Sequence, residues 1–180
     1  MRRPSLLLVA LVLALAGCQS ESGDPGGSSD EPAPDPSAIR DGLATLFAGD
    51  HPGSRENAEG ACFAEMLTAE VTPRELQEAG VLDASYDVVK EPPPLPADVA
   101  VEWADAQLAC ADFVEASTRA QVKVTEGDLD RAAYAKCLRG ELTDAEIRAA
   151  VTASLAGRFD APEVSALSAA QSRCAEQAKP

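Results

Sequence analysis

His51 is the side chain best suited to proton transfer near neutral pH, and it is the only histidine in the sequence. A serine or cysteine nucleophile needs a neighbouring base, so a Ser-His-Asp or Cys-His arrangement here would have to include His51. The residue lies in the segment 49–53, Gly-Asp-His-Pro-Gly, which is rich in turn-forming residues. We therefore expect His51 to be exposed on a loop and not to act as a general base.

The 30 aspartate and glutamate side chains offer carboxylate pairs of the kind that hydrolyse glycosidic bonds. Their spacing singles out no pair, and a single tryptophan provides little aromatic surface for stacking on sugars. The segment 126–130, Glu-Gly-Asp-Leu-Asp, lacks the alternating ligands and closing glutamate of a calcium loop, and Asp128 is expected to cap the following helix. We predict no catalytic residue, no metal-binding residue and no cofactor.

Four further side chains with reactive chemistry are the cysteines Cys62, Cys110, Cys137 and Cys174. None belongs to a Cys-x-x-Cys motif or lies near the histidine, which argues against a zinc site and against a thioredoxin-like redox site. In an exported protein, an even number of such thiols is expected to oxidise to disulfides. Four cysteines allow three connectivities, and their spacing alone does not choose among them.

Two segments of the chain, at about 55–115 and 128–178, show the same order of features, which predicts an internal duplication. Each has a cysteine followed by an apolar residue, then a Thr-x-x-Glu capping box, then Ala-Gln-x-x-Cys-Ala and an acidic residue. Coincidence in an alanine-rich sequence is the alternative explanation. If the copies are real, the simplest pairing lies within each copy and joins Cys62 to Cys110 and Cys137 to Cys174.

The first 18 residues contain the strongest localisation signal. Arg2 and Arg3 precede an unbroken run of leucine, valine and alanine from Leu6 to Ala16. That run is about half of the roughly 20 residues that a transmembrane helix needs, and it is typical of the hydrophobic region of a signal peptide. It ends in Leu15-Ala16-Gly17-Cys18, which resembles the lipobox of bacterial lipoproteins.

The resemblance to bacterial lipoproteins implies cleavage before Cys18 and transfer of a diacylglyceryl group to its thiol. Two acyl chains anchor a protein stably, where one chain gives only marginal binding. The resemblance thus implies a signal peptide at 1–17 and an extracytoplasmic protein held to the cell membrane through Cys18. An ordinary secretory peptide with an incidental cysteine is the alternative. The mature part of the chain is similar to uncharacterised exported helical proteins of high-GC Gram-positive bacteria. This similarity implies the kind of organism and says nothing about activity.

Composition divides the rest of the chain into a tether and a domain. Residues 18–37 are mostly glycine, serine, proline and acidic residues, so we expect a disordered tether that continues from the lipid anchor. Residues 38–180 have the length of one domain. The formal net charge of the chain is −15, and such a surface repels phosphate backbones. We therefore expect no nucleic-acid partner.

Helical periodicity dominates the predicted domain, and aromatic content is only 4%. Proline residues between 92 and 96 predict a loop over about 83–97, Gly80 predicts a left-handed helix end, and Asp160 predicts a helix cap. Trp103, on the same helical face as Cys110, is expected in the core. The predicted fold class is all-α: a disulfide-stapled helical bundle made of two diverged helical repeats. Its helices are expected at about 38–48, 56–67, 73–79, 98–118, 128–139, 144–156 and 161–177.

These features predict a non-enzymatic binding module of the cell envelope, whose partner is an envelope protein or a small ligand. The lack of a marked catalytic constellation, the tether and the paired helical units favour this hypothesis. Two alternatives stay open at this point. One is an envelope hydrolase that uses a carboxylate pair, and the other is an acidic structural lipoprotein without a specific ligand.

Overall fold

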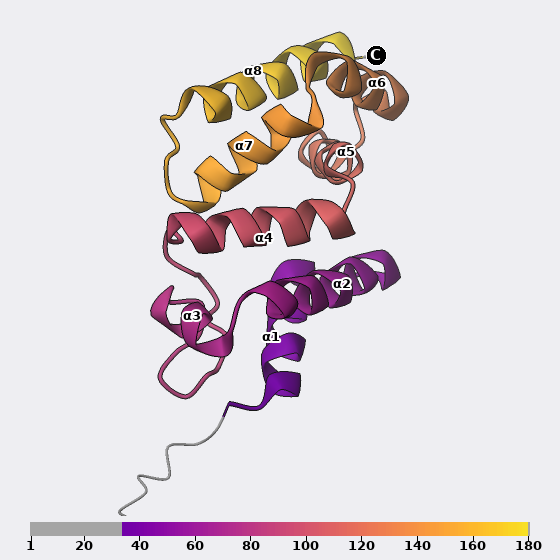
Figure 1. The fold of residues 1–180 in the computed structure, drawn as a ribbon. Coiled ribbons are helices and arrows are strands. Elements are labelled where there is room, and N and C mark those ends of the chain that lie inside the picture. The colour runs from indigo at the N-terminus through magenta and orange to yellow at the C-terminus, as the bar shows by residue number, and fades with distance from the viewer. Residues whose placement is uncertain (1–33, 180) are drawn as a thin grey trace, which may run out of the picture. The chain divides into compact units, whose positions relative to one another are not determined.

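The computed structural model describes residues 34–179, so the predicted signal peptide and Cys18 lie outside the described residues (Figure 1). The described residues belong to one compact unit, Pro32–Pro180. They form eight α-helices and no strand, which confirms the all-α prediction. The helices are α1 (Pro36–Ala48), α2 (Ser54–Glu70), α3 (Pro73–Glu78), α4 (Ala97–Cys110), α5 (Phe113–Val124), α6 (Arg131–Glu141), α7 (Asp144–Leu155) and α8 (Pro162–Gln177).

Local sequence signals begin and end several of these helices as predicted. The Thr72 hydroxyl accepts from the Glu75 backbone N–H, and the Glu75 carboxylate accepts from the Thr72 N–H, so the capping box of α3 is complete. Thr143 and Glu146 form the same reciprocal pair at the start of α7. Gly80 follows α3 with φ of 75°, a left-handed conformation that glycine adopts without strain.

The predicted helix 98–118 is wrong, because the chain breaks into α4 and α5 at Ala111 and Asp112. Ala111 is extended, with φ of −134°, and it ends α4. The Asp112 carboxylate then accepts a hydrogen bond of 2.9 Å from the backbone N–H of Glu115 and caps α5. No glycine or proline lies at this break. The apolar residues keep their helical spacing across it, so periodicity by itself predicts one continuous helix.

Two predicted caps are also wrong by one or two residues. Asp130 caps α6 in place of Asp128, because its carboxylate accepts from the N–H groups of Ala132 and Ala133 at 3.0 Å. Ala161 is the N-cap of α8 in place of Asp160 and gives no side-chain hydrogen bond, while Pro162 fills the first helical position. The first helix starts at Pro36, two residues before its predicted start.

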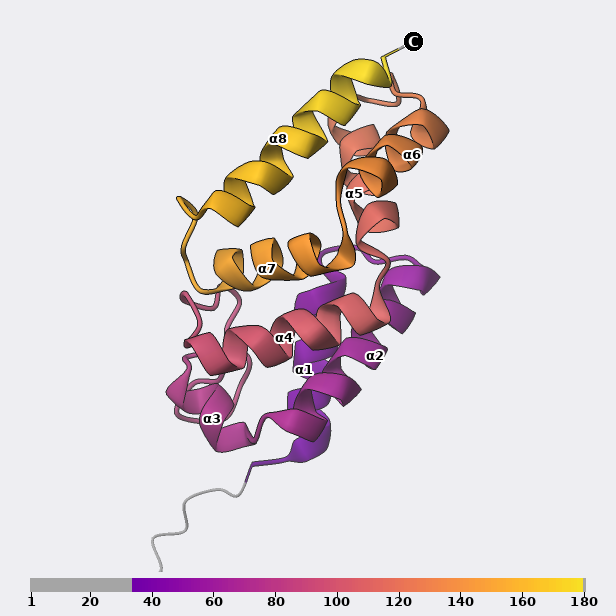
Figure 2. The ribbon, with the colours of Figure 1, turned by 45° about the horizontal axis from the view of Figure 1, so that its top comes forward.

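Helix α4 lies between the two halves of the described unit (Figures 1 and 2). It packs against α2 on one side and against α7 on the other, while α1 packs on α2, α5 on α6, and α8 on both α6 and α7. Trp103 of α4 is 7% exposed and its ring meets that of Phe63, with centroids 4.9 Å apart. Trp103 is therefore a core residue, as predicted.

The second half of the chain has its own buried cluster around Tyr134, Leu138 and Cys174. A third cluster, centred on Ala104, Ile147 and Val151, joins α4 to α7. Backbone hydrogen bonds reinforce these contacts, since the Leu95 N–H donates to the Leu155 carbonyl at 2.8 Å. Within residues 34–179, no helix has the length and apolar character that crossing a membrane requires.

The two halves show the same helix order, but the internal duplication stays a prediction. Each half has a cysteine helix, a capping-box helix and a second cysteine helix, in the order α2, α3, α4 and α6, α7, α8. Cys62 lies ten residues before the Thr72 cap, whereas Cys137 lies six before Thr143. The difference of four residues is about one helical turn, so both cysteines can occupy the same face of their helices.

Candidate functional site

Within residues 34–179, His51 and Asp128 both lie exposed, in different parts of the fold. His51 is exposed in the turn between α1 and α2, where its φ is 57°. Asp128 is exposed beside Gly127, away from any cluster of metal ligands: among residues 34–179, no group of three or more His, Cys, Asp or Glu side chains could hold a metal ion. The exposed position of His51 agrees with its predicted place on a loop.

The cysteines form the two predicted disulfides. Cys62 on α2 is bonded to Cys110 at the end of α4, and Cys137 on α6 is bonded to Cys174 on α8. The Cα atoms of the pairs are 5.6 and 5.5 Å apart, which is the usual distance for a disulfide. The first bond fixes the end of α4, and therefore fixes the short link to α5.

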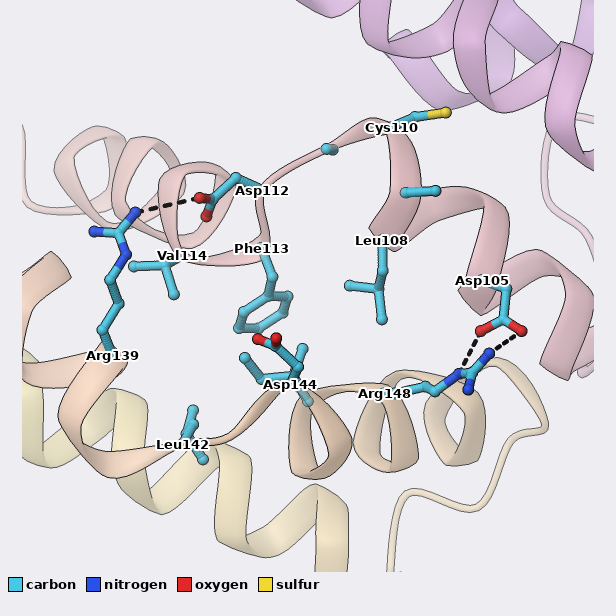
Figure 3. A pocket seen from close by; sticks show the side chains of 13 residues that line it. Asp105, Leu108, Cys110, Asp112, Phe113, Val114, Arg139, Leu142, Asp144 and Arg148 are labelled. Atoms are coloured by element: carbon cyan, nitrogen blue, oxygen red, sulfur yellow. Dashed lines mark hydrogen bonds and ion pairs between the residues drawn. The ribbon is translucent and has the colours of Figure 1, made fainter.

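A cleft of about 710 Å³ opens beside that link, between the α4–α5 and α6–α7 connections (Figure 3). Its volume falls in the range of small-molecule binding sites. Its wall is partly apolar and includes the half-buried side chains of Leu108, Phe113 and Leu142. The buried side chain of Ile147 also lines it. These residues also pack in or against the cluster that joins α4 to α7, so the apolar wall is part of the fold.

Two ion pairs border the cleft. Arg148 of α7 contacts Asp105 of α4 through two guanidinium nitrogens, and Nη2 of Arg139 lies 3.2 Å from Oδ2 of Asp112 (Figure 3). Both guanidinium groups are therefore already neutralised by a carboxylate. The Asp105 hydrogen bond also raises the pKa of Arg148 above its ordinary value.

Asp112 has a second role, because it also caps α5. The backbone N–H of Glu115 is the main cause that lowers the pKa of the Asp112 carboxyl, and the hydrogen bond from Arg139 adds to it, although partial burial acts in the opposite direction. A general acid at neutral pH needs a raised pKa. This carboxylate is suited to holding a positive charge and not to donating a proton.

A third acidic residue, Asp144, has no such partner. It is the first residue of α7 and is exposed, and its side chain makes no hydrogen bond or ion pair with the other residues of the range 34–179. Figure 3 shows its carboxylate directed into the cleft below the Phe113 ring. The cleft thus combines an apolar wall, two neutralised guanidinium groups and one carboxylate available to a ligand.

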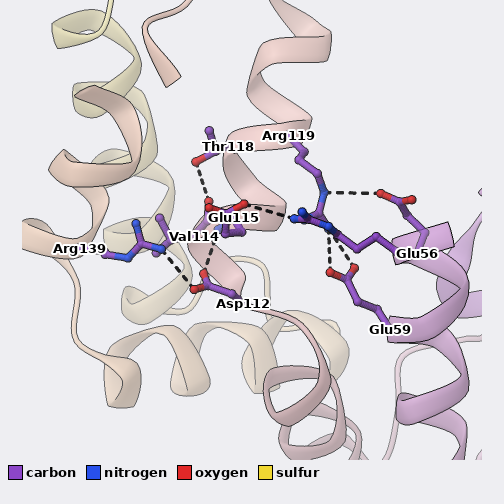
Figure 4. A network of polar contacts seen from close by, with 9 residues as sticks. Glu56, Glu59, Asp112, Val114, Glu115, Thr118, Arg119 and Arg139 are labelled. Carbon is purple, nitrogen blue, oxygen red and sulfur yellow. Dashed lines mark hydrogen bonds and ion pairs between the residues drawn. The ribbon is translucent and has the colours of Figure 1, made fainter. Parts of the chain in front are cut away.

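A second hollow, of about 390 Å³, lies on the other side of the α4–α5 link. It is lined by Trp103, Phe47 and Arg119. It also shares two lining residues, Leu108 and Phe113, with the cleft. Figure 4 shows Arg119 reaching from α5 to Glu56 and Glu59 on α2. This network holds α5, and with it Phe113, in place against the first half of the chain.

Sequence reasoning predicted a disulfide for Cys110 but assigned a binding role to none of the side chains that line the cleft. The two ion pairs join residues that are 27 and 43 positions apart in the chain, so no local sequence pattern predicts them. One local signal was present: Asp112 stands three residues before Glu115, in the pattern of a helix start. That signal could have placed the break between α4 and α5, which creates one wall of the cleft.

Comparison with known proteins gave no relative from which to transfer a function. No family model matches the chain, and no curated protein or solved structure matches it significantly.

Proposed function

We propose that this chain is a lipid-anchored extracytoplasmic protein and that its helical domain is a non-enzymatic binding module, with the cleft beside the α4–α5 link as its binding site. The cleft is the observation that carries the proposal. It has the volume of a ligand site, an apolar wall and a few polar groups at its edge, which is the usual composition of such sites.

The charges of the cleft favour binding over hydrolysis. Asp105 is engaged by Arg148, and the pKa of Asp112 is lowered. A carboxylate-pair hydrolase needs one acid with a raised pKa and a second that converges on the same bond. The paired state of these carboxylates supports a binding role.

The membrane part of the proposal rests on Leu15-Ala16-Gly17-Cys18. Cells that express the full chain are grown with labelled palmitate, and the same is done for Cys18→Ser. We expect label on the wild-type protein in the membrane fraction and none on the variant. Ser20→Ala, which changes a residue just beyond the lipobox, serves as the matched control and should keep its label. Equal labelling of the wild type and Cys18→Ser would refute lipidation at this residue.

Hydrogen–deuterium exchange tests the cleft itself. The full chain, purified into lipid nanodiscs, is titrated with phenol, a small apolar probe that has one hydroxyl group. We expect slower exchange in peptides that cover 105–114 and 139–148, while peptides from 54–70 stay unchanged. Protection that is absent from the first two segments, or spread evenly over the chain, would contradict a binding site at this position.

A further inference from the structure

The available charge in the cleft is a carboxylate. Arg148 and Arg139 are each engaged by an aspartate, at Asp105 and Asp112 respectively. An incoming anion would have to displace one of these carboxylates from its guanidinium group and would then lie close to it. An incoming cation meets Asp144, which has no described partner to displace.

Helix α7 does not need Asp144 as a cap. Thr143 and Glu146 complete the capping box by themselves, with the Glu146 carboxylate 2.8 Å from both the backbone N–H and the hydroxyl of Thr143. A negative charge in the first turn of a helix is favoured by the helix dipole, so a carboxylate at Asp144 is compatible with the start of α7. The Asp144 side chain is thus not needed to cap α7, and its oxygen atoms stay open to the cleft.

The wall opposite this carboxylate suits an apolar body next to a positive charge. The Phe113 ring and the Leu108 side chain both point into the cleft from α5 and α4 (Figure 3). An aromatic face attracts a cation as well as an apolar group, and the attraction grows where water is partly excluded. The acidic chain, with its net charge of −15, also raises the local concentration of cations.

On this basis we propose that the cleft binds a small organic cation: a protonated amine joined to an aromatic or branched aliphatic body. The ammonium group lies at the Asp144 carboxylate, and the body lies against Phe113 and Leu108. The inference rests on the proposed function of the cleft as a binding site, and it adds the chemical class of the ligand.

Three probes with the same body and different head groups test this class. The full chain in lipid nanodiscs is titrated calorimetrically with 2-phenylethylammonium, 2-phenylethanol and 3-phenylpropionate, with empty nanodiscs as the blank. We expect the ammonium probe to bind more tightly than the neutral alcohol by about 1.5- to fivefold, the range of an exposed ion pair. The carboxylate probe should bind most weakly.

Asp144→Asn is the decisive variant, because it removes the charge and keeps the capping box of α7. It should remove the preference for the ammonium probe over the alcohol. Asp98→Asn removes an acid from the first turn of α4, away from the cleft, and should preserve the preference. Phe113→Leu should weaken the binding of all three probes. The order of their affinities should stay the same.

The outcomes test the chemical class of the ligand separately from the existence of the binding site. Equal binding of the ammonium and alcohol probes, tighter binding of the carboxylate, or an unchanged preference in Asp144→Asn would overturn the amine inference and leave the cleft as a binding site. Absence of binding by all three probes, together with absence of protection by phenol, would overturn the cleft as well.

Discussion

Nη2 of Arg119 on α5 lies 2.9 Å from Oε2 of Glu59 on α2, a residue 60 positions earlier in the chain. Nε of the same guanidinium is 3.7 Å from Oε1 of Glu56. The Arg119 and Glu59 side chains are only 26% and 16% exposed, so solvent screens this pair less than an ordinary surface ion pair. The pair joins α5 to α2, and it therefore links the two halves of the unit in addition to the α4–α7 contact.

Removing the charge of Glu59 should therefore destabilise the fold. We expect Glu59→Gln to lower the free energy of unfolding by about 1–2 kcal/mol, because it weakens a charge-assisted hydrogen bond to a partly buried guanidinium. Urea denaturation measures the change. Glu65→Gln alters an exposed residue of the same helix that has no described partner, and it should change stability by less than about 0.5 kcal/mol. Equal effects of the two variants would show that the ion pair contributes nothing.

A close helix contact predicts opposite effects for two glycine substitutions. A Cβ atom at Gly60 of α2 would lie 2.5 Å from the backbone oxygen of Ala44 on α1, whereas a Cβ at Gly140 of α6 meets nothing within 4 Å. Gly60→Ala should cost about 1–3 kcal/mol, since α1 and α2 must move apart. Gly140→Ala should stabilise by about 0.5–1 kcal/mol, since alanine favours a helix. Thermal unfolding of both variants checks the prediction, and stabilisation by Gly60→Ala would contradict it.

The disulfide connectivity can be tested without any variant. Proteolysis of the non-reduced protein and mass spectrometry should yield peptides that join Cys62 to Cys110 and Cys137 to Cys174. A peptide that joins a cysteine of one pair to a cysteine of the other would refute the connectivity.

Loss of a disulfide should have a large effect on stability. The bonds close loops over 48 and 37 positions, and chain entropy puts each at about 4 kcal/mol. The double variant Cys137→Ala/Cys174→Ala should therefore unfold at a much lower urea concentration than the wild type. A difference below about 1 kcal/mol would mean that the second half of the chain does not depend on its cross-link.

The capping boxes predict how stability responds to acid. The hydrogen bond from the Thr143 N–H, followed by that from its hydroxyl, lowers the pKa of Glu146 below its ordinary value of 4.5. Because the folded state holds the ionised form, this stabilisation is present above pH 4.5 and is lost as the pH falls through the folded pKa. Glu75 behaves in the same way in the box of α3.

Glutamine can keep the geometry of a capping box but does not titrate. Glu146→Gln should therefore reduce the slope of stability against pH below 4.5, and adding Glu75→Gln should reduce it further. Urea unfolding at a series of pH values measures the slope. A slope in the double variant that equals the wild-type slope would contradict the assigned role of these carboxylates.

Much of the local structure followed from short-range signals. Thr72 with Glu75 and Thr143 with Glu146 set two helix starts, and Gly80 set a helix end, because each signal involves groups within a few residues of one another. The missed break at Ala111 shows the limit of periodicity. The apolar pattern continues through it, and only the Asp112 cap marks it.

The predicted disulfides came from the order of features in the two halves and not from the spacing of the cysteines. The structure has both pairs, although Cys62 and Cys137 differ by about one helical turn in their distance from the cap that follows each. A disulfide depends on the face that a cysteine occupies on its helix, so a shift of about one turn preserves it.

By itself, the sequence determined the helical class of the domain, the capping-box helix starts and the buried position of Trp103, because these depend on local hydrogen bonds and on the apolar face of a helix. Only the tertiary structure decided that Phe113 and Asp144 point into one cleft and that Asp105 and Asp112 neutralise its two arginines. These residues come from four helices and the α4–α5 link, and their meeting depends on how α4 packs against α7 and how α5 packs against α6. Such packing is set by the sum of many distant contacts, which no short segment of the chain encodes.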